Sequence, residues 1–149
     1  MYLKPDVTRS LISFRYFALG LLYHFNGQDA AALQLWIRIV DGELQDCTRS
    51  DLYEYIVDFL CCSSNMKMVW KYADWALRKD PTTGVHIFTK RPVSKGRSEV
   101  NPDEVITYLG KHSQALLLYL EHLVLERKIQ VKKELINCNQ EMLENQSVT

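Results

Sequence analysis

The chain has 149 residues, a length typical of one domain and sufficient to bury a hydrophobic core without disulfides or metals. Eighteen lysine and arginine residues balance eighteen aspartate and glutamate residues, so the formal net charge is zero, which argues against a general nucleic-acid binder and against electrostatic attachment to an anionic membrane. The longest apolar run, residues 115–120, is far shorter than the roughly 20 residues of a membrane-spanning helix.

Helical periodicity begins near residue 16 and predicts a pair of helices. The first is expected to end at Gly27, which follows an asparagine and forms a common C-terminal stop. Asp29 is expected to cap the second helix, and Gly42 to end it. The apolar face of this second helix consists of Ala32, Leu33, Trp36, Ile37 and Val40.

Two further helices are predicted over residues 51–62 and 66–79. Thr48 or Ser50 is expected to cap the first of them. The second is expected to stop before Pro81, because the residue that precedes a proline is pushed out of the α region. The apolar line of the third helix consists of Leu52, Ile56 and Leu60, and Asp51, Glu54 and Asp58 form an opposite, solvated stripe.

Helix start signals recur in the second half of the chain. Asp80, followed by a proline, is expected to cap a short helix that reaches about residue 88. Asn101, also followed by a proline, starts a helix that is expected to end at Gly110. Ser113 is expected to cap the next helix.

The last predicted helix changes character along its length. Residues 115–125 are apolar almost all the way round, which predicts burial against neighbours on several sides. From Lys128 onward the composition is more polar, and a weak amphipathic helix is expected, with fraying at the end of the chain.

Residues 89–100 contain proline, glycine and serine without apolar periodicity, so a loop is expected there. The loop contains one acidic residue and four basic residues, which are Lys90, Arg91, Lys95 and Arg97. This basic patch is a candidate contact for phosphate or an acidic partner; the alternative is a solvated loop without a specific role.

The first predicted hairpin fits the tetratricopeptide repeat pattern. A large residue, a Leu-Gly pair, an aromatic residue and then small and aromatic positions fall on that spacing at Tyr16, Leu19, Gly20, Tyr23, Ala32 and Trp36. Glycine costs about 1 kcal/mol relative to alanine inside a helix, so Gly20 predicts a close approach of the two helices. A generic helical hairpin is the alternative. No segment alternates as a strand does, and the expected fold is all-α, with about seven helices in a bundle or an α-solenoid.

No catalytic motif is recognisable in this sequence. It lacks the nucleophile-elbow, zinc-protease and phosphate-loop patterns. His122 directly follows a glutamate inside an apolar helix, and a structural role is expected for this histidine. The chain has four cysteines without metal-ligand spacing: Cys47, Cys61, Cys62 and Cys138. They are expected to be free thiols in a reducing cytosol. We therefore expect no catalytic residue, cofactor or metal in this chain, and a small helical enzyme is the remote alternative.

A resemblance to a known family rests on several stretches: YFALGLLYHFNGQDAAALQLWIRIVDGELQD (16–46), TRSDLYEYIVDFL (48–60), WKYADWAL (70–77), GVHIFTKRP (84–92), NPDEVITYL (101–109) and ALLLYLEHLVLERK (115–128). In this order they resemble the first helical domain of the vacuolar sorting tether subunits. This family comprises subunits of the HOPS and CORVET tethers and includes transforming growth factor-beta receptor-associated proteins, to which the likeness points most closely.

The resemblance implies an α-solenoid segment of tetratricopeptide-like or clathrin-heavy-chain-like repeats from a large cytosolic protein. On this basis residues 1–15 are an atypical lead-in, residues 16–128 the helical-repeat domain, and residues 129–149 a divergent, partly helical or frayed tail. The chain then looks like a fragment or a truncated isoform. No family site residue is carried over to this sequence.

The expected function is that of a non-catalytic interaction module in a CORVET-like endosomal tethering subunit, acting in vesicle-mediated transport from endosome to lysosome. The resemblance implies class C tether subunits as partners, an early-endosomal Rab GTPase that binds through other domains, and a cytoplasmic location at the periphery of early endosomes. One alternative is an adaptor for transforming growth factor-beta receptors or SMAD proteins. Another is a HOPS-type subunit in lysosomal fusion.

Overall fold

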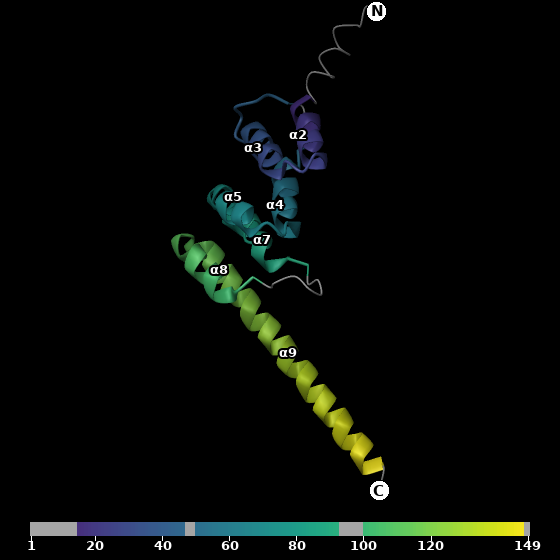
Figure 1. The fold of residues 1–149 in the computed structure, drawn as a ribbon. Helices are drawn as coiled ribbons and strands as arrows, with labels where there is room; N and C mark the ends of the chain where they lie inside the picture. The colour runs from purple at the N-terminus through teal and green to yellow at the C-terminus, as the bar shows by residue number, and fades with distance from the viewer. Residues whose placement is uncertain (1–14, 47–49, 93–99, 148–149) are drawn as a thin grey trace, which may run out of the picture. The chain divides into compact units, whose positions relative to one another are not determined.

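A computed structural model of the chain describes residues 15–46, 50–92 and 100–147 (Figure 1). Within these ranges every regular element is helical and no strand occurs, which confirms the predicted all-α class. The chain divides into two compact units, residues 1–97 and 98–149, and each is described by itself. None of the described helices has both the length and the apolar character that crossing a membrane requires.

The helices follow the predicted order closely. In the first unit they are α2 (Arg15–Phe25), α3 (Asp29–Val40), α4 (Leu52–Cys62), α5 (Met66–Lys79), α6 (Pro81–Gly84) and α7 (His86–Thr89). In the second unit they are α8 (Pro102–Tyr108), the 3₁₀ turn η1 (Leu109–Lys111) and α9 (Ser113–Ser147).

Two glycines end α2 and α3 in the same way. Gly27 and Gly42 have φ angles of 78° and 82°, in the left-handed region. After α2, the N–H of Gln28 donates to the carbonyl of Tyr23 at 2.8 Å, and the N–H of Gly27 donates to His24 at 3.0 Å. This pair of bonds is the Schellman motif, and an equivalent pair follows α3. Both predicted helix ends are therefore confirmed.

Two of the caps predicted for the first unit are wrong. Gln28, not Asp29, precedes α3, and Asp29 is the first helical residue. Its carboxylate instead contacts Nδ1 of His24 at 2.6 Å, close to the positive end of the helix. Asp51, not Ser50, precedes α4, and its side chain makes no capping bond. Thr48, the other candidate cap, lies outside the described residues.

The core of the first unit lies between α3, α4 and α5. Its large, fully buried side chains include Trp36, Leu33, Ile56, Leu60 and Val69. Polar bonds add to this packing at the ends of the helices. The Asp41 carboxylate at the end of α3 accepts from Nε1 of Trp75 at 3.0 Å and from Nζ of Lys79 at 3.1 Å.

The segment after α5 forms two short helices instead of the predicted single one, since α6 and α7 meet at Val85. Gly84 is buried at the end of α6, and a Cβ there would lie 2.9 Å from the carbonyl oxygen of Ala76 in α5. The two backbones can approach this closely because position 84 has no side chain.

Asp80 caps α6, as predicted, and this makes its contribution dependent on pH. Its carboxylate accepts from the Thr83 hydroxyl at 2.8 Å and from the Thr82 N–H at 3.0 Å. The bond from Thr83 and those from the backbone hold the pKa of Asp80 below its ordinary value. The ionised cap therefore stabilises the fold fully above the unfolded pKa of about 3.9, and this contribution is lost as the pH falls through the lower folded pKa.

We therefore expect Asp80→Ala to lower the free energy of unfolding by about 1 kcal/mol at neutral pH. The difference from the unmodified chain should shrink in strong acid, and urea titrations across the acid range measure it. Asp80→Asn is the control, because an asparagine keeps a capping oxygen that does not titrate. A difference that stayed constant into strong acid would contradict this assignment.

The second unit begins at the predicted cap. Asn101 Oδ1 accepts from the N–H of Asp103 at 3.0 Å, and Pro102 is the first residue of α8. The helix passes into η1, which contains Gly110. Ser113 is the first residue of α9 and not its cap, because the first α9 bond runs from the N–H of Leu116 to the carbonyl of His112.

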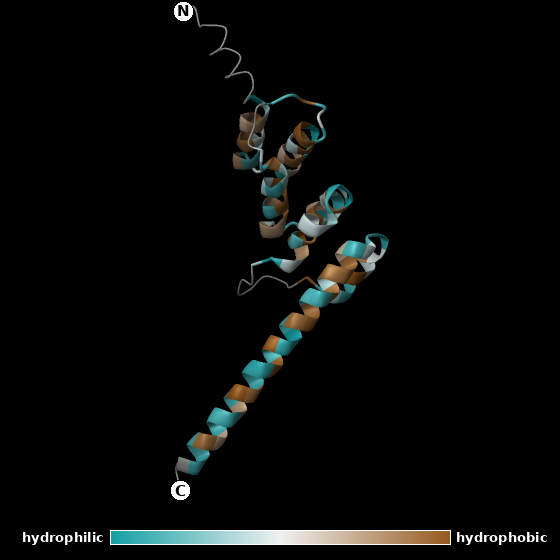
Figure 2. Ribbon diagram, turned by 180° about the vertical axis from the view of Figure 1, so that it is seen from behind, coloured by the Kyte–Doolittle hydropathy of each residue, from teal (hydrophilic) through white to brown (hydrophobic). Residues whose placement is uncertain are grey.

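The predicted burial of residues 115–125 on several sides is wrong. Ala115 and Tyr119 are buried, but Leu117, Val124 and Leu125 are 58%, 56% and 58% exposed. The apolar run packs on η1. The helix does not end where the composition changes at Lys128; it continues to Ser147, with hydrophobic and hydrophilic bands that alternate along it (Figure 2).

Candidate interaction surface

Gly20 of α2 lies directly against the side chain of Trp36 in α3. Among the described residues of α2, Gly20 alone is buried, and Trp36 is fully buried. A Cβ at position 20 would lie 2.1 Å from Nε1 of Trp36. The indole Nε1–H donates to the carbonyl oxygen of Phe17 at 3.3 Å, so the ring lies against the α2 backbone.

Aromatic rings from α2 and α4 surround Trp36. Its ring centroid lies 5.9 Å from that of Phe17 in α2, and 5.3 Å and 5.4 Å from those of Tyr55 and Phe59 in α4. The two contacts with α4 are edge-to-face, the favoured geometry for aromatic pairs. The repeat pattern did not include Phe17, although its position three residues before Gly20 places both on one helix face.

The other residues of the repeat pattern divide between the interior and the surface. Ala32 is buried, Tyr16 and Tyr23 are half-buried, and Leu19 is 37% exposed. Leu19 faces outward because it lies about 100° around the helix from Gly20. It belongs to an exposed apolar surface with Leu22 and Phe25, which are 59% and 79% exposed. These three residues are called the α2 face below.

The predicted basic patch is only partly described, since Lys95 and Arg97 lie outside the described residues. Lys90 is exposed. Arg91 is half-buried, and its guanidinium donates to the carbonyl oxygens of Leu60, at 3.3 Å, and Ser63. It therefore holds the C-terminal end of α4, where carbonyl groups lack helical partners, and this bonding gives it a structural role.

An open cavity of about 320 Å³ lies beside α2 and α4. It is lined by His24, Asp29, Phe59, Cys62, Ser63, Ser64 and Asn65. The His24–Asp29 contact fixes the imidazole, and the Phe59 ring lies edge-on to it at 5.0 Å. Within the described part of the chain, no cluster of three histidine, cysteine or acidic side chains could hold a metal ion.

The adjacent thiols of Cys61 and Cys62 differ in environment. Cys61 is buried, and this burial, followed by the neighbouring Cys62, raises the pKa of Cys61 to about 11. Cys62 and Cys138 are exposed. Because the thiolate is the reactive form, Cys61 is both shielded and protonated near neutral pH.

We expect iodoacetamide to modify Cys62 and Cys138 of the folded chain at mildly alkaline pH and to leave Cys61 largely unmodified. Fragment mass spectrometry separates the adjacent cysteines. Modification of Cys61 in urea serves as the control. Equal labelling of Cys61 and Cys62 in the native chain would show that α4 opens locally.

Comparison with known proteins identifies a family whose matched region contains the α2–α3 hairpin. Residues 6–77 match the family described as Vacuolar sorting protein 39 domain 1. Over these residues the chain belongs to that family. The transforming growth factor-beta receptor-associated protein 1 homolog of Danio rerio is 68% identical over 120 residues, which cover 80% of this chain and 14% of the relative.

Other members of the vacuolar sorting family are also similar. Transforming growth factor-beta receptor-associated protein 1 of Homo sapiens is 56% identical over 117 residues, or 78% of this chain and 14% of the relative. The vacuolar protein sorting-associated protein 39 homolog of Caenorhabditis elegans is 32% identical over 110 residues, or 72% and 12%. The chain thus spans a small part of the relatives' length. No solved structure matches it.

The family match contains the Gly20–Trp36 hairpin, the α2 face and most of α5, and it ends at Leu77. It starts at residue 6, ahead of the boundary that the sequence predicts at Tyr16. The cavity beside α2 and α4 also lies inside the match, whereas Lys90 and Arg91 lie beyond it.

Proposed function

We propose that this chain is a non-catalytic protein-interaction module of a CORVET-like endosomal tethering subunit. In this role it acts in vesicle-mediated transport between endosome and lysosome. The observation that carries the proposal is the 68% identity to a transforming growth factor-beta receptor-associated protein 1 homolog, together with the vacuolar sorting protein 39 match over the hairpin.

The fold supports an α-solenoid as the architecture of the module. Each repeat in a solenoid stacks on its neighbours, so a helix at the end of a segment presents an apolar side to the next repeat. The α2 face has this character, because Leu22 and Phe25 are more than half exposed at the start of the described chain. In this architecture residues 16–128 form the repeat domain, with an atypical lead-in before it and a divergent tail after it.

The proposed partners are other class C tether subunits, which contact the module through its α2 face. An early-endosomal Rab GTPase binds the wider assembly through other domains, and the protein is cytoplasmic and peripheral on early endosomes. An apolar surface rimmed by polar groups is typical of such protein contacts. The His24–Asp29 contact and Gln28 provide polar groups at one end of this surface.

Co-purification tests the proposal. The tagged chain, expressed in cells, should retain class C tether subunits, and the Leu22→Glu/Phe25→Glu variant should lose them while its circular dichroism and melting temperature stay unchanged. Ala30→Glu is the matched control, because it adds a charge at an exposed position of α3 outside the α2 face. Absence of class C subunits from the unmodified chain would overturn the proposal.

A second candidate function rests on the names of the most similar relatives, which describe them as receptor-associated. In that case the helical surface binds the cytoplasmic tail of a transforming growth factor-beta receptor, or a SMAD protein. A pull-down against receptor tails and tether subunits side by side separates the two functions. Retention of the receptor tail alone favours the adaptor. A HOPS-type role ranks lower, since the vacuolar protein sorting-associated protein 39 homolog is only 32% identical to this chain.

A further inference from the structure

The helix α9 carries a heptad pattern along its exposed side. Spacings of four and three residues alternate between residues 117 and 142, and this line is called the α9 seam. Its apolar members are Leu117, Val124, Val131, Leu135, Cys138 and Met142. Alternation of this kind is the signature of helices that pair as coiled coils, and the 35-residue helix is about five heptads long.

The seam is open within its own unit. Leu117, Val124, Leu135 and Met142 are 58%, 56%, 59% and 63% exposed, whereas the buried Tyr119 lies on the opposite side of the helix. A groove of about 320 Å³ runs along the first part of the seam, between Leu117 and Lys128. Apolar bands continue along the rest of the helix (Figure 2).

Charges at and beside the seam disfavour a parallel partner of the same sequence. The remaining two seam positions are Glu121 and Lys128. In a parallel pair in register, each of these would face its own copy, and Arg127 would face Lys132 of the other helix. Like charges juxtaposed at a helix interface are a recognised device against wrong pairings.

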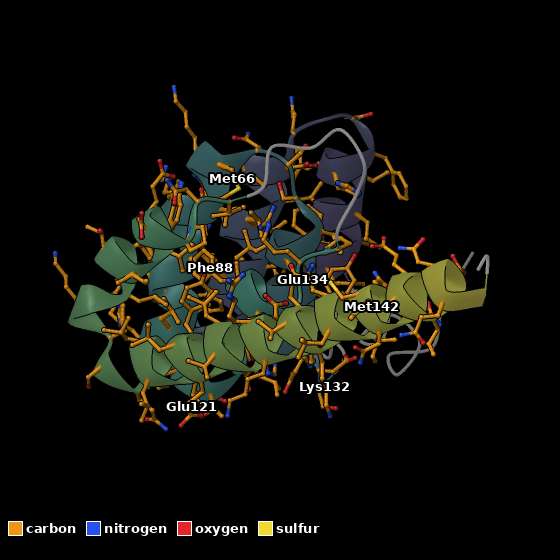
Figure 3. All side chains as sticks on the ribbon, turned by 90° about the horizontal axis from the view of Figure 1, so that it is seen from below. Met66, Phe88, Glu121, Lys132, Glu134 and Met142 are labelled. Atoms are coloured by element: carbon orange, nitrogen blue, oxygen red, sulfur yellow. The ribbon has the colours of Figure 1, made fainter. Side chains whose placement is uncertain are left out.

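An antiparallel partner of the same sequence removes these conflicts. With Val124 opposite Leu135 of the second copy, Leu117 lies opposite Met142. Neither Glu121 nor Lys128 then lies opposite a residue of the same charge. Arg127 and Glu134 lie seven residues apart on one flank, so each Arg127 then faces a Glu134 of the other copy. Figure 3 shows Lys132 and Glu134 on opposite sides of α9, so Lys132 lies away from the pairs that Arg127 and Glu134 form.

From this pattern we infer that α9 pairs with α9 of a second copy of this chain. The two helices run antiparallel along their seams, with Arg127 of each facing Glu134 of the other. In the single chain, the exposed Glu134 carboxylate accepts from Nε2 of Gln130 at 3.3 Å. The self-pairing is separate from the proposed tether contact, because it uses no residue of the α2 face.

Light scattering with size exclusion measures the mass of the full chain. The measured mass should rise with protein concentration toward twice the 17.4 kDa of one chain. Arg127→Glu and Glu134→Lys each create two like-charge contacts and should weaken dimerisation by roughly tenfold, whereas the double variant should restore it. Lys133→Glu, on the side away from the seam, is the matched control. A chain that stays monomeric, or a double variant that dimerises no better than the single ones, would overturn the inference.

Cross-linking tests the direction of the helices. In a Val124→Cys/Leu135→Cys/Cys138→Ser variant, oxidation should join position 124 of one copy to position 135 of the other. Trypsin cuts between the two positions, so mass spectrometry identifies the joined peptides. Disulfides that link 124 to 124 or 135 to 135, or a Cys138–Cys138 disulfide as the main product in the unmodified chain, would show a parallel pair and refute the inferred arrangement.

Discussion

Gly20→Leu should destabilise the chain by about 3 kcal/mol, even though leucine is the better helix former. A Cβ at position 20 would lie 2.1 Å from Nε1 and 2.6 Å from Cε2 of Trp36, which is fully buried. The indole would have to move, and its bond to Phe17 would be lost with it. Urea denaturation followed by circular dichroism measures the change.

Ala18→Leu is the matched control for this substitution, because it adds the same side chain to an exposed position of the same helix. A double-mutant cycle identifies the cause. Gly20→Ala should cost less in a Trp36→Phe background than alone, because phenylalanine lacks the Nε1 atom that the new Cβ meets. If the two changes were simply additive, the contact with the indole would not be the source of the loss.

Gly84→Leu should be about as costly, for a different reason. A Cβ at position 84 meets backbone atoms of α5: the Ala76 carbonyl oxygen at 2.9 Å and the Leu77 nitrogen at 3.0 Å. No side-chain rotation relieves such a contact, so α6 must separate from α5, and we expect a loss of at least about 2 kcal/mol. Thermal and urea unfolding of the full chain measure it.

Gly84→Ala should already show much of the loss, since the first added carbon makes the contact. Gly110→Ala is the control, because a Cβ there meets nothing within 4 Å. A stable Gly84→Ala variant would mean that α6 moves away from α5 without cost.

Local signals predicted the elements of this fold well. Gly27 and Asp80 were identified from neighbouring residues alone, and the structure confirms both. The end of α5 at Lys79 was also predicted correctly, because Asp80 precedes a proline and is therefore kept out of the α region. Caps, stops and periodicity depend on atoms within a few residues, and such interactions are readable from one sequence.

Features that depend on distant partners were predicted less well. Nothing beside Gly84 in the sequence indicates that α5 passes close to it, and Arg91 was grouped with a basic loop although its partners are carbonyl groups of α4 and the residue after it. The apolar residues of α9 were predicted to be buried, but hydrophobic periodicity indicates only which residues are apolar and not which element packs against them. Leu117 and Val124 face outward in the unit. The exposure of the α2 face was not predicted for the same reason, since the sequence does not indicate which apolar side chains lack a packing partner.

The glycines also bear on how this sequence can diverge. At Gly27 and Gly42 the backbone geometry is the constraint and the surroundings are empty, so asparagine, which tolerates left-handed angles, is an acceptable replacement in related chains. At Gly20 and Gly84 the neighbours are the constraint, and no replacement is neutral unless its partner changes too. Evolution is therefore free to vary the first pair one site at a time, whereas Gly20 can change only together with position 36.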